Sequence, residues 1–520
     1  MPSQDFLSEL FLPSLKTAHQ PTLHLALYRA FQQAIVQGKL APGVKLPASR
    51  PLSQSLGVAR NTVKTAYDML QAEGYLETRH GAGSFVSAQL PEQVLQSAAT
   101  ALPAQQQAQG VRLSELAQTL QTVRYPPQVP SGALLSIAEP CMTHYPWEAW
   151  QRSVAVAARR LRTHEMASPL GNPELRARIA DYLQVARGVH CEAGRIMICS
   201  GSQQAMYLAL RLLLNPGEYI LVEDPGYSGV DGALAAVGGH KIAVAADADG
   251  FRLEDGLAQA PEARMALVTP SRNFPLGHTL SLERRLALIH WAREQGAWLL
   301  EDDYDSEFRF DGSPLTALQG LGGEDCVIYA GTFSRILQHS LRLGYLVLPD
   351  ALVEPFERAR RYLDGGLSQL PQQALAEFMA SGAFAGHVRR MRKLYAQRRH
   401  ILQALMAEQL GDWLTPVGSD GSMHVVYLLR EGLDDQAICQ EALQQGLGIR
   451  PLSLYYAGTP PQQGLVIGFA GYGEEKLCEG VGRLRNVLCN RWPELGVNHI
   501  VMSPLLSGAG GFGKNSVLTI

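Results

Sequence analysis

Short apolar runs alternate with segments of helical periodicity along the middle of the chain, and this alternation limits the folds that are open to it. The runs are RIMICSG near residue 195, YILVEDPGY near 219, MALVTPS near 265, WLLEDDY near 298, CVIYAGTFS near 326 and LGYLVLP near 343. Strands that alternate with helices favour a mostly parallel sheet with helices on both faces. From about residue 370, long helical segments are followed by the shorter strands MHVVYLL and GLVIGFA. We therefore predict a large α/β domain with a smaller α/β subdomain packed on it.

Residues 90–130 differ in composition from the rest of the chain. They are rich in Ala, Gln, Ser and Pro and nearly free of large apolar side chains, which is typical of an interdomain linker. The length of 520 residues also exceeds what one hydrophobic core usually serves. We predict a small domain at 15–88, a linker at 89–134, a large domain at 135–365, a small domain at 366–492 and a flexible tail at 493–520.

The N-terminal domain has the pattern of three helices followed by a hairpin. Residues 22–37 place apolar side chains on one helical face, and Gly38 is suited to end that helix. A short helix between 49 and 57 and a longer one over 60–72 follow, and GYLETRHGAGSFVS supplies two short strands. Two helices joined by a tight turn, the second with a polar outer face, indicate a helix-turn-helix, and the strand pair indicates a wing.

This segment resembles the GntR-type winged helix-turn-helix through the ordered marks GKLAPGVKLPASRPLSQSLGV, ARNTVKTAYDMLQAEGY and GAGSFV. The resemblance implies binding to the operator half-sites of double-stranded DNA, where phosphate contacts position the duplex and base-edge contacts specify it. The implied DNA-binding residues are Arg50, Arg60, Asn61, Thr62, Lys64, His80 and Gly81. Ala59 departs from the family, which usually has a serine cap there, so we expect a weaker helix start.

The alternative interpretation of this segment is a small helical domain with an ordinary solvated basic face. Residues 1–90 carry 8 basic and 5 acidic side chains, whereas the whole chain has 45 Lys and Arg against 48 Asp and Glu. Because so small a local excess is common on protein surfaces, charge supports the DNA-binding interpretation only weakly. The ordered marks favour it much more strongly.

In the large domain, polar residues follow several of the expected strands. They lie in SGSQQAMYLAL, EDDYDSEF and TFSRILQHSLRLGY, at carboxyl ends of strands, where open α/β sheets bind ligands. The backbone amides that begin the helix after Gly201, together with Thr332, Ser334 and Arg342, could bind a phosphate group.

These segments in combination resemble the fold-type I aminotransferase domain, as it is fused to GntR modules in the MocR family of bacterial regulators. Further marks are GNPELRARIADYLQVARGV, VEDPGYSG, TPSRNFPLG, HVRRMRKLYAQRRHIL and GSMHVVYLL, and the resemblance spans about residues 135–490. It implies a site for pyridoxal 5′-phosphate, in which Asp302 pairs with the pyridine nitrogen, Tyr304 meets the phenolic oxygen and Tyr227 stacks on the ring. The predicted cofactor-binding set is Ser202, Gln203, Tyr227, Asn273, Asp302, Tyr304, Thr332, Ser334, Arg335 and Arg342. The resemblance places Ser202, Gln203, Thr332 and Arg342 around the phosphate, whereas Asn273 and Arg335 depart from the family pattern.

Position 335 departs from the family in a way that decides the chemistry. The family's Schiff-base lysine should stand there, but this chain has Arg335. A guanidinium, with a pKa above about 12, stays protonated and cannot be the amine nucleophile that bonds to the cofactor. Val466 also stands at about the place where the family has an arginine that anchors the substrate's α-carboxylate. We therefore expect no transaminase activity, and we assign no catalytic residue and no metal ligand.

The retained residues still suggest a binding site. Arg335, Arg342 and Arg272 would gather positive charge near Asp302 and Tyr304, and planar guanidinium groups suit phosphate or carboxylate groups. Our hypothesis is a transcription regulator whose aminotransferase-like domain binds pyridoxal 5′-phosphate non-covalently, or another small anionic metabolite. The resemblance further implies a homodimer that can exchange its DNA-binding modules, and the effector would shift the equilibrium between arrangements of that dimer.

Two other functions stay open at this point. The first is an active pyridoxal-phosphate-dependent aminotransferase with an appended DNA-binding domain, which would need another lysine in the pocket, such as Lys241 or Lys393. The second is a dimerisation platform that has lost all ligands, which would leave a constitutive DNA binder. The retained ring and phosphate residues argue against this platform.

The cysteines and the hydropathy of the sequence indicate the cellular compartment of the protein. The seven cysteines lie far apart and form no CxxC pair, which fits free thiols in a reducing compartment. The first residues lack the basic and apolar regions of a signal peptide, and no run of about 18 apolar residues occurs. We expect a cytoplasmic protein that does not enter the membrane.

Overall fold

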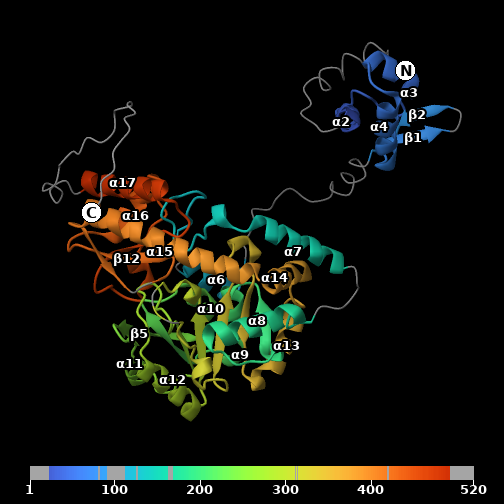
Figure 1. Cartoon of the computed structure of the whole chain (residues 1–520). Helices are drawn as coiled ribbons and strands as arrows, with labels where there is room; N and C mark the ends of the chain where they lie inside the picture. The colour runs from blue at the N-terminus through green and yellow to red at the C-terminus, as the bar shows by residue number, and fades with distance from the viewer. Residues whose placement is uncertain are drawn as a thin grey trace, which may run out of the picture. The chain divides into compact units, whose positions relative to one another are not determined.

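The computed structural model describes residues 23–79, 82–90, 112–123, 127–161, 168–310, 312, 314–418 and 421–491. The chain divides into two compact units, residues 1–112 and residues 113–520 (Figure 1). Each unit has its own apolar core and is described by itself.

The first unit is a helical domain with a two-stranded wing. Its elements are α2 (Leu23–Val36), α3 (Ser49–Leu56), α4 (Arg60–Ala72), β1 (Leu76–Arg79) and β2 (Gly83–Val86), and the two strands pair antiparallel. Gly57 ends α3 in the left-handed conformation, with φ of 65°, so that α4 begins three residues later. Phe31 of α2 and Val63 of α4 are fully buried in the shared core. This arrangement confirms the predicted winged helix-turn-helix.

The second unit is built on an eight-stranded sheet with the order β3-β10-β9-β8-β7-β4-β5-β6. The strands are β3 (Ile196–Cys199), β4 (Tyr219–Asp224), β5 (His240–Asp247), β6 (Gly250–Phe251), β7 (Met265–Val268), β8 (Trp298–Asp303), β9 (Val327–Thr332) and β10 (Gly344–Val347). Strands β5, β4, β7, β8 and β9 run parallel, whereas β10 is antiparallel to both β3 and β9 and β6 is antiparallel to β5. The mostly parallel sheet expected from the alternating pattern is confirmed.

Helices cover both faces of this sheet. The helices of the large domain are α7 (Trp147–Arg160), α8 (Pro173–Arg187), α9 (Ser202–Leu213), α10 (Gly229–Val237), α11 (Leu253–Gln259), α12 (Leu282–Gln295), α13 (Asp350–Leu363) and α14 (Gln369–Ala380). Val222 of β4 packs in one apolar layer with Met206 of α9, whereas its neighbour Leu221 packs in another layer with Leu288 of α12. This alternation follows from the two-residue period of a strand, and it accounts for the nearly unbroken apolar runs in the sequence.

A second, antiparallel sheet forms the smaller subdomain. Its order is β11-β12-β14-β13, with strands β11 (Leu414–Val417), β12 (His424–Leu429), β13 (Arg450–Pro451) and β14 (Gly464–Gly468). The long helix α15 (Ala383–Leu410) and α16 (Asp435–Gln444) both pack against α17 (Glu474–Arg491) (Figure 1). Both strands predicted here from the sequence, MHVVYLL and GLVIGFA, are present.

Part of the segment assigned to the linker is helical. Helix α6 (Glu115–Thr122) begins at Ser114, whose side chain accepts a hydrogen bond from the Ala117 amide, and it packs against α10. The predicted tail at 493–520 lies outside the described residues. Among the described residues, none of the helices is long and apolar enough to cross a membrane.

Candidate functional site

The start of α4 carries most of the predicted DNA-binding residues. Arg60, Asn61 and Lys64 are exposed, and Thr62 is half-buried. Nε of Arg60 donates a hydrogen bond to Oγ of Ser49 over 3.3 Å, so the start of α4 lies beside the start of α3, where Arg50 is also exposed. His80 and Gly81 lie outside the described residues. As expected, Ala59 provides no side-chain cap for α4.

The wing adds two cations that the sequence analysis did not single out. The Arg79 guanidinium carbon lies 4.7 Å from the centre of the Phe85 ring, and Nζ of Lys45 lies 5.8 Å from it. Both cationic residues are exposed. Arg79 lies within the predicted hairpin and could have been found there, whereas Lys45 precedes α3 and reaches the wing only through its bridge with Phe85. Their shared packing on Phe85 places positive charge on the wing.

In the second unit, the predicted cofactor residues lie where strands of the large sheet end. Asp302 is the second-to-last residue of β8, and Thr332 is the last residue of β9. Ser202 begins α9 after β3, whereas Tyr227 follows β4 and Asn273 follows β7. The structure thus places these positions at one edge of the sheet, the edge that binds ligands in open α/β folds.

Aromatic rings pack around the centre of this region. The Phe274 ring lies 5.6 Å from the Tyr304 ring, 6.1 Å from Tyr227 and 5.1 Å from Tyr455, measured between ring centres. Tyr455 belongs to the short helix η6 (Leu452–Tyr455) of the smaller subdomain. The large sheet and the smaller subdomain therefore both contribute to the pocket, which sequence spacing could not reveal.

Several buried polar atoms in this region have no hydrogen-bond partner among the described residues. They are Oδ1 of Asn273, Oδ1 of Asp302, the hydroxyl of Tyr304, Oγ of Ser334 and Nη1 of Arg335. Buried polar groups in folded proteins nearly always have partners. All five atoms belong to residues that the sequence analysis assigned to the cofactor site, so this cluster is suited to a polar ligand.

Arg335 lies within this cluster. Its guanidinium carbon is 4.9 Å from the centre of the Tyr304 ring and 5.9 Å from that of Phe274. Burial raises the pKa of Asp302 to about 7, and the positive charge of Arg335 opposes that rise. Burial also raises the pKa of Tyr304 well above its usual value. The carboxyl group and the guanidinium are thus electrostatically coupled.

The predicted phosphate end is formed by the start of α9. Gly201 precedes this helix with φ of 81° and ψ of 177°, and it offers no side-chain cap. Nη2 of Arg342 donates to the carbonyl oxygen of Ser200 over 3.1 Å, so its guanidinium lies near uncapped backbone amides. Oγ1 of Thr332 accepts a hydrogen bond from the Ser334 amide over 3.2 Å. A cation beside an uncapped helix start is suited to an anion.

Gln203 and Arg272 are engaged within the protein. Nε2 of Gln203 donates to the Gly229 carbonyl oxygen over 2.8 Å, and its Oε1 accepts from the Tyr227 hydroxyl over 3.3 Å. Nε of Arg272 lies 3.7 Å from Oδ1 of Asp305, and both side chains are buried. The sequence analysis expected Arg272 to add positive charge near Asp302. In the structure, Arg272 pairs with Asp305, a carboxylate that the sequence analysis had not considered.

Glu223 is a site residue that the sequence analysis missed. It is fully enclosed near the end of β4, and its Oε2 accepts hydrogen bonds from the hydroxyl and, over 3.1 Å, the amide of Thr269. Burial raises the pKa of Glu223 to about 7, and the nearby charge of Asp302 contributes to that rise. The signal was present in YILVEDPGY, where a carboxylate ends an apolar run.

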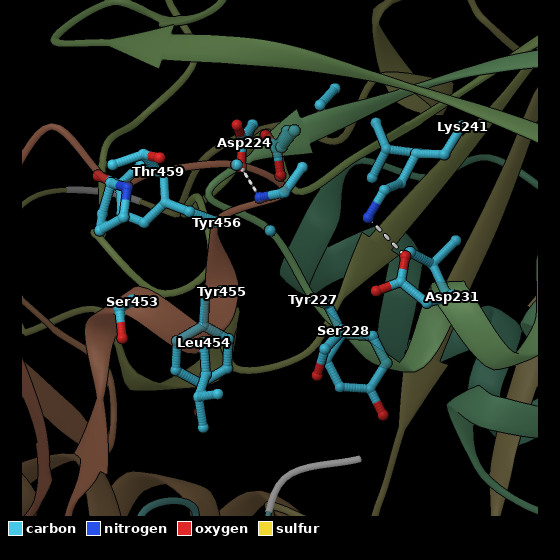
Figure 2. A pocket seen from close by; sticks show the side chains of 18 of the residues that line it. Asp224, Tyr227, Ser228, Asp231, Lys241, Ser453, Leu454, Tyr455, Tyr456 and Thr459 are labelled. Atoms are coloured by element: carbon cyan, nitrogen blue, oxygen red, sulfur yellow. Dashed lines mark hydrogen bonds and ion pairs between the residues drawn. The ribbon is translucent and has the colours of Figure 1, made fainter. Parts of the chain in front are cut away.

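A cavity of about 770 Å³ lies next to the aromatic pocket and shares Tyr227 and Tyr455 with it. Figure 2 shows it between the end of β4, α10 and the loop after η6, where Oδ1 of Asp224 accepts from the Ala457 amide over 2.9 Å. Nζ of Lys241 lies 2.5 Å from Oδ1 of Asp231 (Figure 2). Lys241 is thus held in an ion pair on this wall of the cavity.

Comparisons with known proteins agree with this architecture. Residues 23–86 match the family "Bacterial regulatory proteins, gntR family", and residues 133–484 match "Aminotransferase class I and II". A probable rhizopine catabolism regulatory protein, MocR, of Rhizobium meliloti is 36% identical, over 89% of this chain and 93% of its own length. The pyridoxine biosynthesis transcriptional regulator PdxR of Corynebacterium glutamicum is 32% identical, over 90% of this chain and 96% of its own length.

Among solved structures, a multiple substrate aminotransferase from Thermococcus profundus is similar with a TM-score of 0.64 and 24% identity. The match covers 75% of this chain and 98% of that one. This likeness shows the fold of the second unit. The two family matches and the two whole-length relatives show that the chain belongs to the MocR-type family of HTH-type transcriptional regulators, which join a GntR module to an aminotransferase class I and II domain.

Proposed function

We propose that this chain is a DNA-binding transcription regulator whose aminotransferase-like unit senses pyridoxal 5′-phosphate non-covalently, or another small anionic metabolite, without transaminase activity. The observation that carries the proposal is the cluster of buried, unsatisfied polar atoms around Arg335, at the position where the family has its bond-forming lysine. Such a cluster is suited to a polar ligand, but it lacks an amine that could attack one.

The residues fit pyridoxal 5′-phosphate as a bound ligand. Oδ1 of Asp302 is suited to a protonated ring nitrogen, the Tyr304 hydroxyl to the phenolic oxygen, and Oγ of Ser334 to a phosphate oxygen. Tyr227 offers its ring to the pyridine face, and Asn273 adds an amide. When bound, the cofactor supplies an aldehyde and an electron-accepting ring.

The phosphate would lie at the start of α9. Ser202 and Gln203 provide the first backbone amides of that helix, and the Arg342 guanidinium provides a charge beside them. Thr332 orders the loop through its hydrogen bond with Ser334. Backbone amides at a helix start together with a guanidinium suit a phosphate dianion.

Two features support the absence of transamination. A guanidinium keeps its proton at any physiological pH, so Arg335 offers no lone pair to a carbonyl carbon. Val466 of β14 is fully buried among apolar neighbours, at about the place where the family has its carboxylate anchor. The rival lysines do not replace the missing one, since Lys241 is paired with Asp231 and Lys393 is exposed on α15.

The DNA-binding part of the proposal rests on the exposed start of α4 with Arg60, Asn61, Thr62 and Lys64, on Arg50, and on the HTH-type names of the relatives. We further propose a homodimer, so that two winged modules meet two half-sites, and that the effector changes the population of dimer arrangements. We propose domain limits of 15–88 for the DNA-binding module and of 135–365 and 366–492 for the two parts of the sensor.

The test measures, by fluorescence anisotropy, how tightly the full chain binds the DNA upstream of its own gene. We expect specific binding that Arg60→Ala weakens at least tenfold and that pyridoxal 5′-phosphate shifts. Arg29→Ala, an exposed change on α2, is the matched control and should leave affinity unchanged. Equal loss in both variants would contradict the assignment of α4, and an affinity unaffected by any concentration of the cofactor would contradict its role as effector.

A further inference from the structure

Arg335 places a permanent cation at the point where the family's lysine would bond to the aldehyde carbon of the cofactor. Its Nη1 is buried and has no acceptor among the described residues. The guanidinium is held against the Tyr304 ring at 4.9 Å from the ring centre. This packing fixes the group in place and leaves the N–H groups of Nη1 available for a ligand atom.

The charge of Arg335 acts on groups from several elements around the pocket. It opposes the rise in pKa that burial causes at Asp302 in β8, at Asp305 after β8 and at Tyr455 in η6. His424 on β12 stays neutral, because burial takes its pKa to about 3, so that ring adds no cation. Arg272 also acts on Asp305 and His424, but it is paired with Asp305.

We propose that Arg335 makes the pocket select its ligand by the substituent on the carbon to which the lysine would otherwise bond. The pocket accepts a phosphorylated pyridine whose substituent is a hydrogen-bond acceptor, such as an aldehyde or a hydroxymethyl group. It rejects one whose substituent is an ammonium group. This proposal rests on the proposed function, and it deepens that function by defining the ligand class.

The reason is the chemistry of donors and charges. Arginine has five N–H donors and no acceptor, and an ammonium group also only donates. The two groups cannot form a hydrogen bond, and like charges in contact repel. An aldehyde or hydroxyl oxygen instead accepts from Nη1 without adding charge. In an enzyme of this fold, a lysine bonds to the aldehyde and cannot bond to the alcohol, so the enzyme binds the aldehyde form preferentially. Arg335 forms no such bond, so we expect this pocket to bind both forms similarly.

The test is calorimetric titration of the full chain with three probes at pH 7.5: pyridoxal, pyridoxine and pyridoxamine 5′-phosphates. The phosphate and ring are common to all three, so ratios of Kd isolate the substituent. We expect the first two to bind within about threefold of each other and pyridoxamine 5′-phosphate to bind at least 30-fold more weakly. Arg335→Gln should reduce the 30-fold ratio to below about fivefold, because it keeps a donor and removes the charge.

Arg342→Gln is the matched control, because it removes a cation at the other end of the site. It should weaken all three probes by a similar factor and leave the ratios unchanged. Equal binding of all three probes, or tighter binding of the amine, would overturn the inference while the proposed sensor function stands. Absence of heat with every probe would overturn both the inference and the cofactor as effector. Tryptophan fluorescence melting of each variant verifies that it is folded.

Discussion

Replacing Asp302 by Asn should make the ligand-free protein more stable at alkaline pH, because this carboxyl group is buried at a cost. Burial raises its pKa from 3.8 to about 7 in the folded chain. For a carboxyl group with a raised folded pKa, no penalty exists below the unfolded pKa; the penalty grows as pH rises from the unfolded pKa to the folded pKa and stays constant above it. We expect this group to destabilise the natural protein by about 2 kcal/mol at pH 5 and by about 4 kcal/mol at pH 8, at about 1.36 kcal/mol per pKa unit.

The difference between the two pH values, about 2 kcal/mol, is the quantity to measure, because changes in packing cancel from it. All six tryptophans lie beyond residue 146, so their fluorescence during urea unfolding reports on the second unit within the full chain. The free-energy change caused by Asp302→Asn should be more favourable at pH 8 than at pH 5 by about this amount. Asp412→Asn, an exposed change, should show no pH-dependent difference.

The same substitution should weaken pyridoxal 5′-phosphate binding, since it removes a charge-assisted hydrogen bond worth about 1.5–3 kcal/mol. Asp302→Asn is therefore expected to raise the stability of the ligand-free protein and to weaken cofactor binding, as is common for a functional group that is buried at a cost in stability. A free-energy change that is equal at both pH values would refute the reasoning about burial. An unchanged affinity would refute the role of Asp302 at the ring nitrogen.

Three further predictions concern the two units separately. Arg60→Ala should cost about 1–3 kcal/mol of operator affinity if it reads a base edge, and it should leave calorimetric binding of the cofactor unchanged; equal losses on operator and unrelated DNA would instead indicate a phosphate contact. Arg79→Ala on the wing should reduce the slope of log affinity against log salt by about 1, whereas an unchanged slope would exclude a phosphate contact from the wing. Gly201→Ala should destabilise the second unit by about 1–3 kcal/mol, because φ of 81° with ψ of 177° is accessible essentially to glycine alone. It should also weaken cofactor binding at least tenfold, with Gly232→Ala, which meets open space, as the control; binding equal in both variants would contradict a phosphate site at the start of α9.

The sequence was sufficient for the fold class and for six of the eight strands of the large sheet, because those patterns are local, whereas β5 and β6 were not predicted. The apolar runs from residue 195 to 347 became strands of one sheet, and the end of α3 at Gly57 followed from a residue with a left-handed preference. The antiparallel direction of β10 was not predictable in this way, since an apolar run specifies burial and carries no strand direction. Helix α6 was hidden by a composition that resembles a linker.

The site residues that lie in sequence motifs were predictable, whereas the contacts between distant segments were not. Asp302, Tyr304 and Ser334 lie at or just after the ends of strands, and their side chains gather as that topology requires. The contribution of Tyr455 depends on how the smaller subdomain packs, and the pairing of Arg272 with Asp305 depends on the conformation of the loops after β7 and β8. Those contacts are set by tertiary packing, and spacing along the chain does not encode them.

The most direct test of the account is whether the natural protein binds pyridoxal 5′-phosphate reversibly and without a covalent bond. The full chain and Arg335→Lys would be titrated by calorimetry, treated with borohydride and weighed intact by mass spectrometry. The account predicts micromolar or tighter binding to the natural protein with no added mass after reduction, and added mass in the Arg335→Lys variant. A covalent adduct on the natural protein would contradict the account, because another amine would then be taking the place of the missing lysine.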